Sequence, residues 1–317
     1  MRESKTAEVI EKYQTKWRVA EDAAKARRLE AYAKSPEVQK IDSELGATAL
    51  NILSISASGE NIEEKMARLR ERTEALRSRR SELLTDAGFP EDYTDVKYDC
   101  PKCGDTGYVG VKVCDCLRRE IVEASFEDAG IAALAKTQTF DTFDLSYYPS
   151  SERESMRHAY DTLKDFAENF DGKDEPSFLL VGASGLGKTH LSTAVAKRVI
   201  ERGYRVVYDT IDHIIDDFQA ERFRETMTYD ELSDRYFESD LLIVDDLGCE
   251  MMNQFSLSCV YNLINTRLNA GRPTVINTNL TSEELRRSYF DRITSRLFGE
   301  YRILVFKGGD IRRRKLK

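Results

Sequence analysis

The sequence predicts an α/β fold in which helices cover both faces of a parallel sheet, preceded by a helical N-terminal region and a small cysteine-rich module. From Ser177 onward, short apolar runs alternate with amphipathic stretches, which is the order expected for parallel strands joined by crossover helices. A glycine-rich loop directly follows the first apolar run. Upstream, four cysteines lie within seventeen residues, after a long charged stretch.

Apolar runs and the amphipathic stretches between them give the expected elements of the sheet region. The strands are expected at residues 178–181, 204–208, 241–244, 274–278 and 302–306. The helices are expected at residues 188–202, 212–225, 256–269 and 282–289. Because a helix can return the chain to the same edge of the sheet after each strand, parallel pairing is expected throughout.

Residues 1–88 are strongly charged and are expected to be helical. The stretch 6–33 contains neither glycine nor proline, and a later helix is expected to begin at Asn61 with Glu64 completing a capping box. The apolar residues of this later helix follow alternating spacings of four and three, interrupted at Thr73 and Arg80, as in a helical hairpin or coiled coil. They are Ile62, Met66, Leu69, Leu76 and Leu83. Such a region either packs on itself or docks a partner.

Composition and charge restrict the class of protein. Of 317 residues, 41% are hydrophobic and 33% charged, which is the balance of a soluble globular protein. The net charge of −8 argues against coating DNA through bulk positive charge. The local strip at residues 312–317 can still bind phosphates, or it is a solvated basic tail. No apolar run approaches the ~20 residues that span a bilayer, and the N-terminus has no apolar signal core, so a cytoplasmic protein without a membrane partner is expected.

Residues 182–189 form a complete G-x-x-x-x-G-K-T loop between an expected strand and an expected helix. Glycines let the backbone wrap closely around phosphate oxygens, and the helix N-terminus directs free N–H groups at negative charge. Lys188 is expected to reach the β and γ phosphates, and the Thr189 hydroxyl to ligate Mg²⁺. The loop residues expected to bind ATP are Gly182, Ser184, Gly185, Gly187, Lys188 and Thr189.

Two acidic residues end the apolar run at 241–244. Asp245 is expected to hold Mg²⁺ at the carboxyl end of this strand, where open α/β sheets bind ligands. Asp246 lies where a base can polarise the attacking water.

Two further polar features fit a nucleotide site. Asn277 or Asn279, at the end of the strand 274–278, can orient the attacking water. Arg292 and Arg296 lie four residues apart, on one face of a helix, and an arginine supplied to a neighbour's γ-phosphate stabilises the transition state. Ordinary turn chemistry and solvated surface arginines are the alternatives.

The cysteine cluster has the pattern C-x₂-C, ten residues, then C-x-C. Four thiolates at this spacing can close a tetrahedral Zn²⁺ site, which we favour over a redox pair of Cys100 and Cys103. The metal would supply much of the folding energy of so short a stretch. The expected ligands are Cys100, Cys103, Cys114 and Cys116.

With these motifs in order, the chain resembles the bacterial helicase-loader family of DnaC and DnaI, a branch of the AAA+ ATPases. The resemblance covers about residues 96–317. It rests on CPKCGDTGYV with CDCLRRE, TFDTFDLSYYP, GASGLGKTHLS, LLIVDDLGCE, RPTVINTNL, DRITSRLFGE and VFKGGDIRRRK. Residues 1–95 resemble the family only in being a helical extension.

The resemblance implies a division of the chain. Residues 1–95 would be a helical partner-binding region, 96–120 the zinc module, 121–175 a connector and 176–317 the AAA+ ATPase domain. The N-terminal helices and the zinc module would grip a hexameric replicative helicase, and the ATPase domains would assemble with one another.

The resemblance also implies roles for single residues. Lys188, Thr189 and Asp245 would bind Mg-ATP, Asp246 would be the catalytic acid, and Asn277 or Asn279 the first sensor. Arg296 would be an arginine finger across a subunit boundary, with Arg292 beside it. Aromatic and basic side chains of the stretch 210–226 would contact single-stranded DNA, namely Phe218, Arg222 and Arg224.

The chain departs from the common AAA+ pattern at Asp246, where many of these ATPases carry Glu. Slow or partner-stimulated hydrolysis is therefore expected. Two alternatives to a helicase loader stay open. One is an IstB-like transposition helper ATPase with the same core, although the cysteine module favours the loader. The other is a nucleotide-gated adaptor with little turnover.

Overall fold

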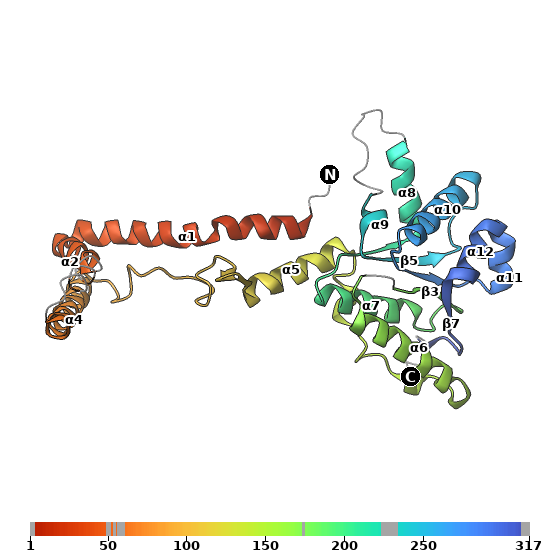
Figure 1. Cartoon of the computed structure of the whole chain (residues 1–317), viewed down its shortest axis with the longest axis horizontal. Coiled ribbons are helices and arrows are strands. Elements are labelled where there is room, and N and C mark those ends of the chain that lie inside the picture. Colours follow the sequence, from red (N-terminus) through yellow and green to blue (C-terminus); the bar gives the residue numbers. More distant parts are fainter. Residues whose placement is uncertain are drawn as a thin grey trace. The chain divides into compact units, whose positions relative to one another are not determined.

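The computed structural model describes residues 4–48, 52, 55, 61–172, 175–222 and 234–311. Its chain divides into two compact units (Figure 1). We call Ile10–Arg118 the helical unit, and Met1–Val9 with Arg119–Lys317 the sheet unit. No helix within the described ranges is both long enough and apolar enough to cross a membrane.

The sheet unit is built on five parallel strands. They are β3 (Ser177–Val181), β4 (Val206–Thr210), β5 (Leu241–Leu247), β6 (Thr274–Thr278) and β7 (Tyr301–Val305). Their order across the sheet is β4-β5-β6-β3-β7. The predicted parallel sheet is confirmed, although β4 begins two residues later than the predicted strand at 204–208.

Helices cover both faces of this sheet (Figure 1). Because side chains alternate between faces along a strand, Phe178 and Leu180 of β3 enter one core cluster and Leu179 enters the other. The first cluster is covered by α6 (Ser150–Asn169) and α7 (Lys188–Glu201). The second is covered by α8 (Ile211–Arg222), α9 (Asp234–Glu238), α10 (Gln254–Asn269), α11 (Ser282–Ser288) and α12 (Asp291–Glu300).

The predicted connector at 121–175 contains more regular structure than expected. It holds most of α5 (Asp115–Asp128), two short 3₁₀ turns at Leu134–Lys136 and Leu145–Tyr147, and α6. Apolar residues of α6 such as Met156 and Leu163 are fully buried in the same cluster as β3 and α7. This part of the chain therefore contributes to the core of the sheet unit, while the domain boundary at 176 stays a prediction.

Arg267 of α10 is fully buried and fastens α9 to the sheet. Its guanidinium donates to the carbonyls of Tyr236 and Ser239 at 2.7 and 3.1 Å, and to the Pro273 carbonyl at 2.7 Å. Burial lowers the pKa of Arg267 to about 9. The last carbonyls of α9 thus gain the donors that a helix end lacks.

The helical unit contains α1 (Lys5–Lys34) from Ile10 onward, α2 (Pro36–Gly46) and α4 (Ile62–Asp86). It also contains a hairpin of β1 (Tyr108–Val109) with β2 (Lys112–Val113). The predicted seam of α4 is half-buried at Met66, Leu69 and Leu76. The predicted capping box is wrong, because Asn61 has a left-handed backbone (φ 51°) and its side chain caps nothing.

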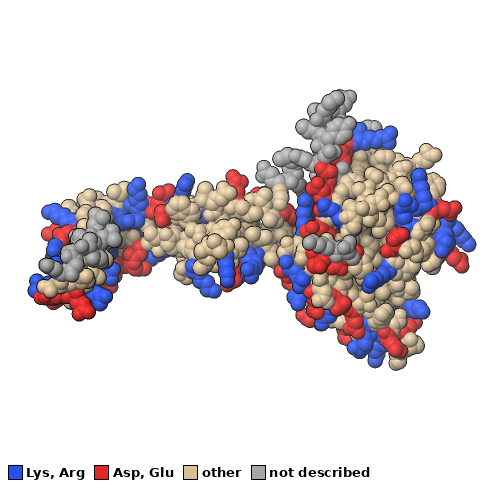
Figure 2. Space-filling model, in the orientation of Figure 1, with Lys and Arg blue, Asp and Glu red and all other residues tan. Residues whose placement is uncertain are grey.

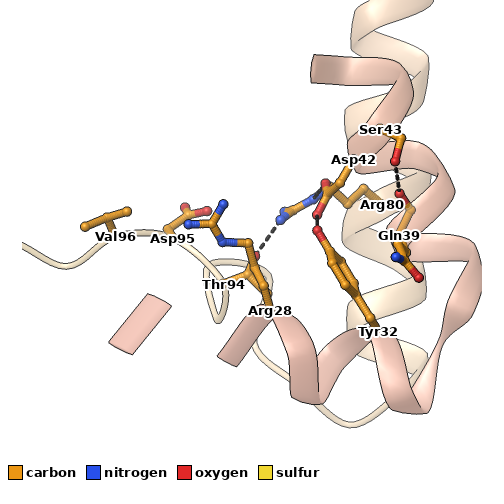
Figure 3. Close-up of a pocket in the computed structure, with 9 residues that line it drawn as sticks. All are labelled: Arg28, Tyr32, Gln39, Asp42, Ser43, Arg80, Thr94, Asp95 and Val96. Atoms are coloured by element: carbon orange, nitrogen blue, oxygen red, sulfur yellow. Dashed lines mark hydrogen bonds and ion pairs between the residues drawn. The ribbon is translucent and has the colours of Figure 1, made fainter. Parts of the chain in front are cut away.

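A partly buried ion pair joins α2 to α4 in this unit. Arg80 donates to Asp42 at 2.6 Å and to Thr94 Oγ1 at 2.5 Å, and Tyr32 donates to Asp42 at 2.8 Å (Figure 3). These side chains line an open pocket of about 500 Å³. Arg80, which interrupts the apolar seam in the sequence, therefore holds the helical hairpin by an ion pair.

Candidate functional site

The loop at 182–189 lies between β3 and α7, as predicted, and its glycines are sterically required. A Cβ on Gly187, where φ is 90°, would lie 2.8 Å from the Phe143 ring and 2.9 Å from Tyr148 Oη. A Cβ on Gly182 would lie 2.5 Å from the Phe306 carbonyl oxygen. A side chain at either position would displace neighbouring segments, so both positions require glycine.

Lys188, at the start of α7, is buried and its ammonium group lies inside the loop. Nζ donates to the carbonyls of Gly182 and Ala183 at 2.5 and 2.9 Å, and to Asn279 Oδ1 at 2.7 Å. An ammonium group has three N–H donors. The loop therefore already holds this cation where the phosphates of a nucleotide would bind.

Asp245 is buried at the carboxyl end of β5. Its Oδ2 accepts from Tyr208 Oη at 2.7 Å, and its Oδ1 accepts from Asn277 Nδ2 at 2.9 Å and from the Asp246 N–H at 3.0 Å. Asn277 Nδ2 also donates to Ser192 Oγ of α7 at 2.8 Å. The carboxylate is thus fixed by neighbours from three elements, as a metal ligand needs.

Asp246 follows at an exposed position with a left-handed backbone (φ 58°). The pairing of β5 with β6 shifts register between Val244 and Leu247, which is a β-bulge around the two acidic residues. Asn279 Nδ2 donates to Asp246 Oδ1 at 3.2 Å while Asn279 Oδ1 accepts from Lys188. The bulge therefore directs the second acidic side chain toward the loop lysine, through Asn279.

The two asparagines occupy different environments. Asn277 is fully buried and contacts Asp245, whereas Asn279 is partly exposed and links Lys188 to Asp246. The sequence did not separate them, because their side-chain types are the same and both lie at the end of the same strand.

Aromatic residues of the segment 137–148 brace the phosphate loop, a contact that the sequence analysis did not predict. Tyr148 Oη donates to the Leu186 carbonyl at 2.7 Å. The Phe143 ring packs edge-on against His190, with centroids 5.3 Å apart, and His190 Nε2 lies 2.9 Å from the Thr139 carbonyl. The sequence feature that could have indicated this contact is the aromatic stretch at residues 140–148, ahead of the loop.

The segment after β7 braces the loop from another side. The Phe306 N–H donates to the Val181 carbonyl at 2.7 Å, and the Ile311 N–H donates to the Gly185 carbonyl at 3.0 Å. The Asp310 carboxylate packs so closely that a Cβ on Gly185 would lie 2.1 Å from it. The basic strip at 312–317 lies outside the described residues.

Arg292 and Arg296 lie on one face of α12, as predicted, and both guanidinium groups stack on Tyr261 of α10, 4.5 and 4.9 Å from the ring centroid. Arg296 Nε also donates to Asn265 Oδ1 at 2.8 Å. Arg292 is exposed and Arg296 half-buried. The contacts found for these two side chains within the described part of the chain are with α10, α12 and Phe290, and none is with the phosphate loop.

The predicted DNA-contacting residues divide between core and surface. The Phe218 ring packs against Tyr236 and Phe237, with centroids 6.0 and 5.7 Å apart. Arg222 is exposed and lies over the Phe255 ring at 5.5 Å. Arg224 lies outside the described residues. Acidic and basic side chains are interspersed on the visible face of the molecule (Figure 2).

The four predicted cysteine ligands converge in the helical unit. All four Sγ atoms lie within 4.8 Å of one another, with Cys100–Cys114 at 3.8 Å and Cys103–Cys116 at 3.5 Å. A tetrahedron with Zn–S bonds of ~2.3 Å has S···S edges of about 3.8 Å. The donor set and its spacing therefore fit a zinc ion.

The surroundings of the thiols add a residue that the sequence analysis missed. Asp105 is buried and accepts the N–H groups of Asp99 and Cys100 at 2.9 and 2.8 Å. The Cys103 backbone N–H holds the pKa of Cys100 down to about 7, whereas burial raises the pKa of Cys116 to about 12. Zinc binds cysteine as the thiolate, so metal binding at this cluster would release protons.

Comparison with known proteins identifies the family of the chain. A family model described as IstB-like ATP binding protein matches residues 123–315, more than half of the chain. The chain belongs to this family of IstB-like ATP binding proteins. It is therefore an ATPase of the DnaC/IstB type, and the matched region holds the phosphate loop, Asp245 and α12.

Relatives of this IstB-like protein include helicase loaders. The replicative helicase loader DnaC of Escherichia coli (strain K12) is 26% identical over 177 residues, which cover 56% of this chain and 69% of that protein. The phage-like element PBSX protein XkdC of Bacillus subtilis (strain 168) is 25% identical over 229 residues, covering 67% and 82%. The crystal structure of the DnaC helicase loader matches with a TM-score of 0.49 at 23% identity, covering 56% of this chain and all of that one.

Two predictions are confirmed for this IstB-like protein. The resemblance to DnaC-type loaders holds at low sequence identity. The fold class also holds, with a helical N-terminal region, a cysteine cluster suited to zinc and a parallel sheet between helices. The roles of single site residues stay predictions.

Proposed function

We propose that this chain is an ATP-dependent loader that delivers a hexameric replicative DNA helicase onto single-stranded DNA in the cytoplasm. The observation that carries the proposal is the convergence of Lys188, Asp245, Asp246 and Asn279 at the carboxyl edge of one parallel sheet, within an IstB-like family whose relatives include replicative helicase loaders. Ligands bind at this edge of open α/β sheets.

The phosphate loop would bind Mg-ATP. Lys188 would exchange the carbonyls of Gly182 and Ala183 for phosphate oxygens, since both carbonyls lie within 2.9 Å of Nζ. Thr189, the next residue, would hold Mg²⁺ together with Asp245. Bound Mg²⁺ neutralises charge that develops on the phosphates during hydrolysis.

Water activation would fall to Asp246 and Asn279. Asp246 is exposed at the edge of the sheet, and the Asn279 amide touches both this carboxylate and Lys188. A water molecule held by Asp246 and Asn279 would therefore lie beside the γ-phosphate that Lys188 binds. Asn277, which is buried against Asp245, would position the metal ligand and not the water.

The four-cysteine module would hold structural Zn²⁺ through Cys100, Cys103, Cys114 and Cys116, which the sulfur spacing supports. With the helices of residues 1–95, this module would bind the helicase.

Arg296, with Arg292 beside it, would act on the nucleotide of a neighbouring copy, since its guanidinium is oriented by Asn265 and Tyr261 of α10. Arg222 and Arg224 would contact single-stranded DNA. Phe218 fits that role less well, because its ring packs against α9.

A loading assay tests the proposal. The host replicative helicase is mixed with the full chain, ATP and a single-stranded DNA circle carrying a short duplex and coated with single-strand-binding protein. The chain is expected to co-purify with the helicase and to start unwinding, and Lys188→Ala is expected to keep helicase binding but lose loading. A chain that neither binds the helicase nor starts unwinding contradicts the proposal.

The family match also favours a second candidate, a transposition helper of the IstB type. This candidate predicts stimulation of a transposase and no binding to the helicase. A nucleotide-gated adaptor predicts helicase binding with a near-zero hydrolysis rate, whether or not single-stranded DNA is present. Steady-state hydrolysis measured beside the loading assay separates all three.

A further inference from the structure

Tyr208 places a buried phenol beside the predicted metal ligand. It lies on β4 opposite Ile243 of β5, two positions before the pair of Thr210 with Asp245. Only 9% of Tyr208 is exposed, and its ring belongs to the core cluster that α6 and α7 cover. Its backbone is held as well, because the Tyr208 N–H donates to the Ala129 carbonyl at 3.2 Å.

Within the described part of the chain, the Tyr208 hydroxyl is the hydrogen-bond donor found for Asp245 Oδ2. Oη donates to Asp245 Oδ2 at 2.7 Å, whereas Asn277 and the Asp246 N–H both donate to Oδ1. A phenol hydroxyl donates one hydrogen bond and a carboxylate oxygen accepts, so the 2.7 Å contact is a hydrogen bond from Tyr208 to Asp245. Without Tyr208, Oδ2 would lose the contact that fixes it.

Ser192 connects this arrangement to the phosphate loop. Its Oγ lies 3.3 Å from Tyr208 Oη and accepts from Asn277 Nδ2 at 2.8 Å. Ser192 lies on α7, one helical turn after Lys188. The helix that positions the phosphate-binding lysine therefore also sets the two side chains that orient Asp245.

We propose that Tyr208 is a positioning residue for Mg²⁺, holding Asp245 Oδ2 so that the carboxylate meets the nucleotide-bound metal with a fixed geometry. The inference rests on the proposed Mg-ATP site. A carboxylate has about four acceptor positions, and the three described donors leave one on Oδ2 for the metal or a metal-bound water. By occupying one acceptor position of Oδ2, Tyr208 determines which position of this oxygen the metal can use.

The test compares Tyr208→Phe with Tyr204→Phe. Tyr204 packs its ring edge-on against Phe170 and lies just before β4, so its substitution removes a phenol hydroxyl of the same chain region. Calorimetry measures nucleotide affinity in EDTA and across a Mg²⁺ titration. Tyr208→Phe is expected to leave affinity in EDTA unchanged and to raise the half-saturating Mg²⁺ concentration at least about tenfold, the scale of a hydrogen bond to a charged group. Tyr204→Phe is expected to match the wild type.

The same titration on an Asp245→Ala background separates positioning from a general loss of structure. Tyr208→Phe should have no further effect there, because its partner is gone. An equal effect on both backgrounds, or a wild-type Mg²⁺ dependence of Tyr208→Phe alone, overturns the inference. Should Tyr208→Phe fail to fold, Ser192→Ala replaces it with the same expected direction. If the wild type binds no Mg-nucleotide at all, the proposed function fails instead.

Discussion

At the scale of single residues, the site is defined by side chains that are close in sequence but different in environment. Asn277 lies in the last part of β6 and Asn279 directly after it. Asn277 is fully buried and donates to Asp245, whereas Asn279 accepts a hydrogen bond from Lys188. Two amides of the same type thus serve different groups, one the predicted metal ligand and the other the predicted water.

Substitution of the two asparagines should therefore give different defects. Asn279→Ala is expected to lower the hydrolysis rate about a hundredfold while nucleotide binding is retained, because a transition-state contact is lost. Asn277→Ala is expected to weaken Mg²⁺-dependent binding and to lower stability by about 1–3 kcal/mol, because a buried carboxylate loses a donor. Steady-state rates, nucleotide titration and thermal melts distinguish these results. The opposite assignment of defects would show that the roles are reversed.

Contiguous motifs were predictable from sequence, and side chains supplied by distant segments were not. Three motifs each occupy a short stretch of sequence, and their residue spacing indicates the ligand they bind. They are the loop with Lys188, the acidic strand end and the four cysteines. Tyr208, Arg267 and Asp105 carry no such pattern. Each acts through partners that only the folded chain brings to it, such as Asp245 for Tyr208. The left-handed backbone at Asn61 likewise overrode a local capping signal.

At the scale of elements, the four cysteines converge in a segment with few buried apolar side chains. β1 and β2 are two residues each, and Tyr108, Val109 and Val111 of this hairpin are exposed. A stretch with so little buried apolar surface depends on other constraints for its stability. Zinc would supply that constraint.

Purified protein is accordingly expected to contain one zinc ion per chain. Cys103→Ser, or a strong chelator, should release it and loosen the helical unit, because metal binding and folding are coupled in such modules. Metal analysis with circular dichroism measures both effects, and nucleotide binding by the sheet unit should persist. Cys259→Ser, at a half-buried thiol of α10, is the matched control. Full stability of Cys103→Ser without zinc would refute a structural role.

At the scale of the whole molecule, the predicted arginine finger requires more than one copy of the chain. Arg296 and Arg292 are held on α12 by contacts with α10 and with their own helix, and have no described contact with the phosphate loop. Such an arginine completes a nucleotide site only when another copy presents its loop. Hydrolysis should therefore depend on protein concentration.

Mixing two inactive variants tests this dependence. Arg296→Ala alone is expected to lose about a thousandfold in hydrolysis rate, and Lys188→Ala is expected to bind no nucleotide. Together they should regain part of the activity, because the intact arginine of one copy serves the intact loop of the other. Arg198→Ala, at a partly exposed arginine paired with glutamates, serves as the control. A mixture that stays inactive contradicts action between copies.

The bulge at the end of β5 gives a reason for the short acidic side chain at its tip. Asp246 has φ 58°, a backbone region that aspartate and asparagine enter more readily than longer side chains do. Asp246→Glu, which would restore the residue that many related ATPases carry, is therefore expected to strain the backbone and to shift the carboxylate away from Asn279. We therefore expect the shape of the main chain to limit turnover in this protein, and a faster variant would need its strand ending remodelled before the acid is changed.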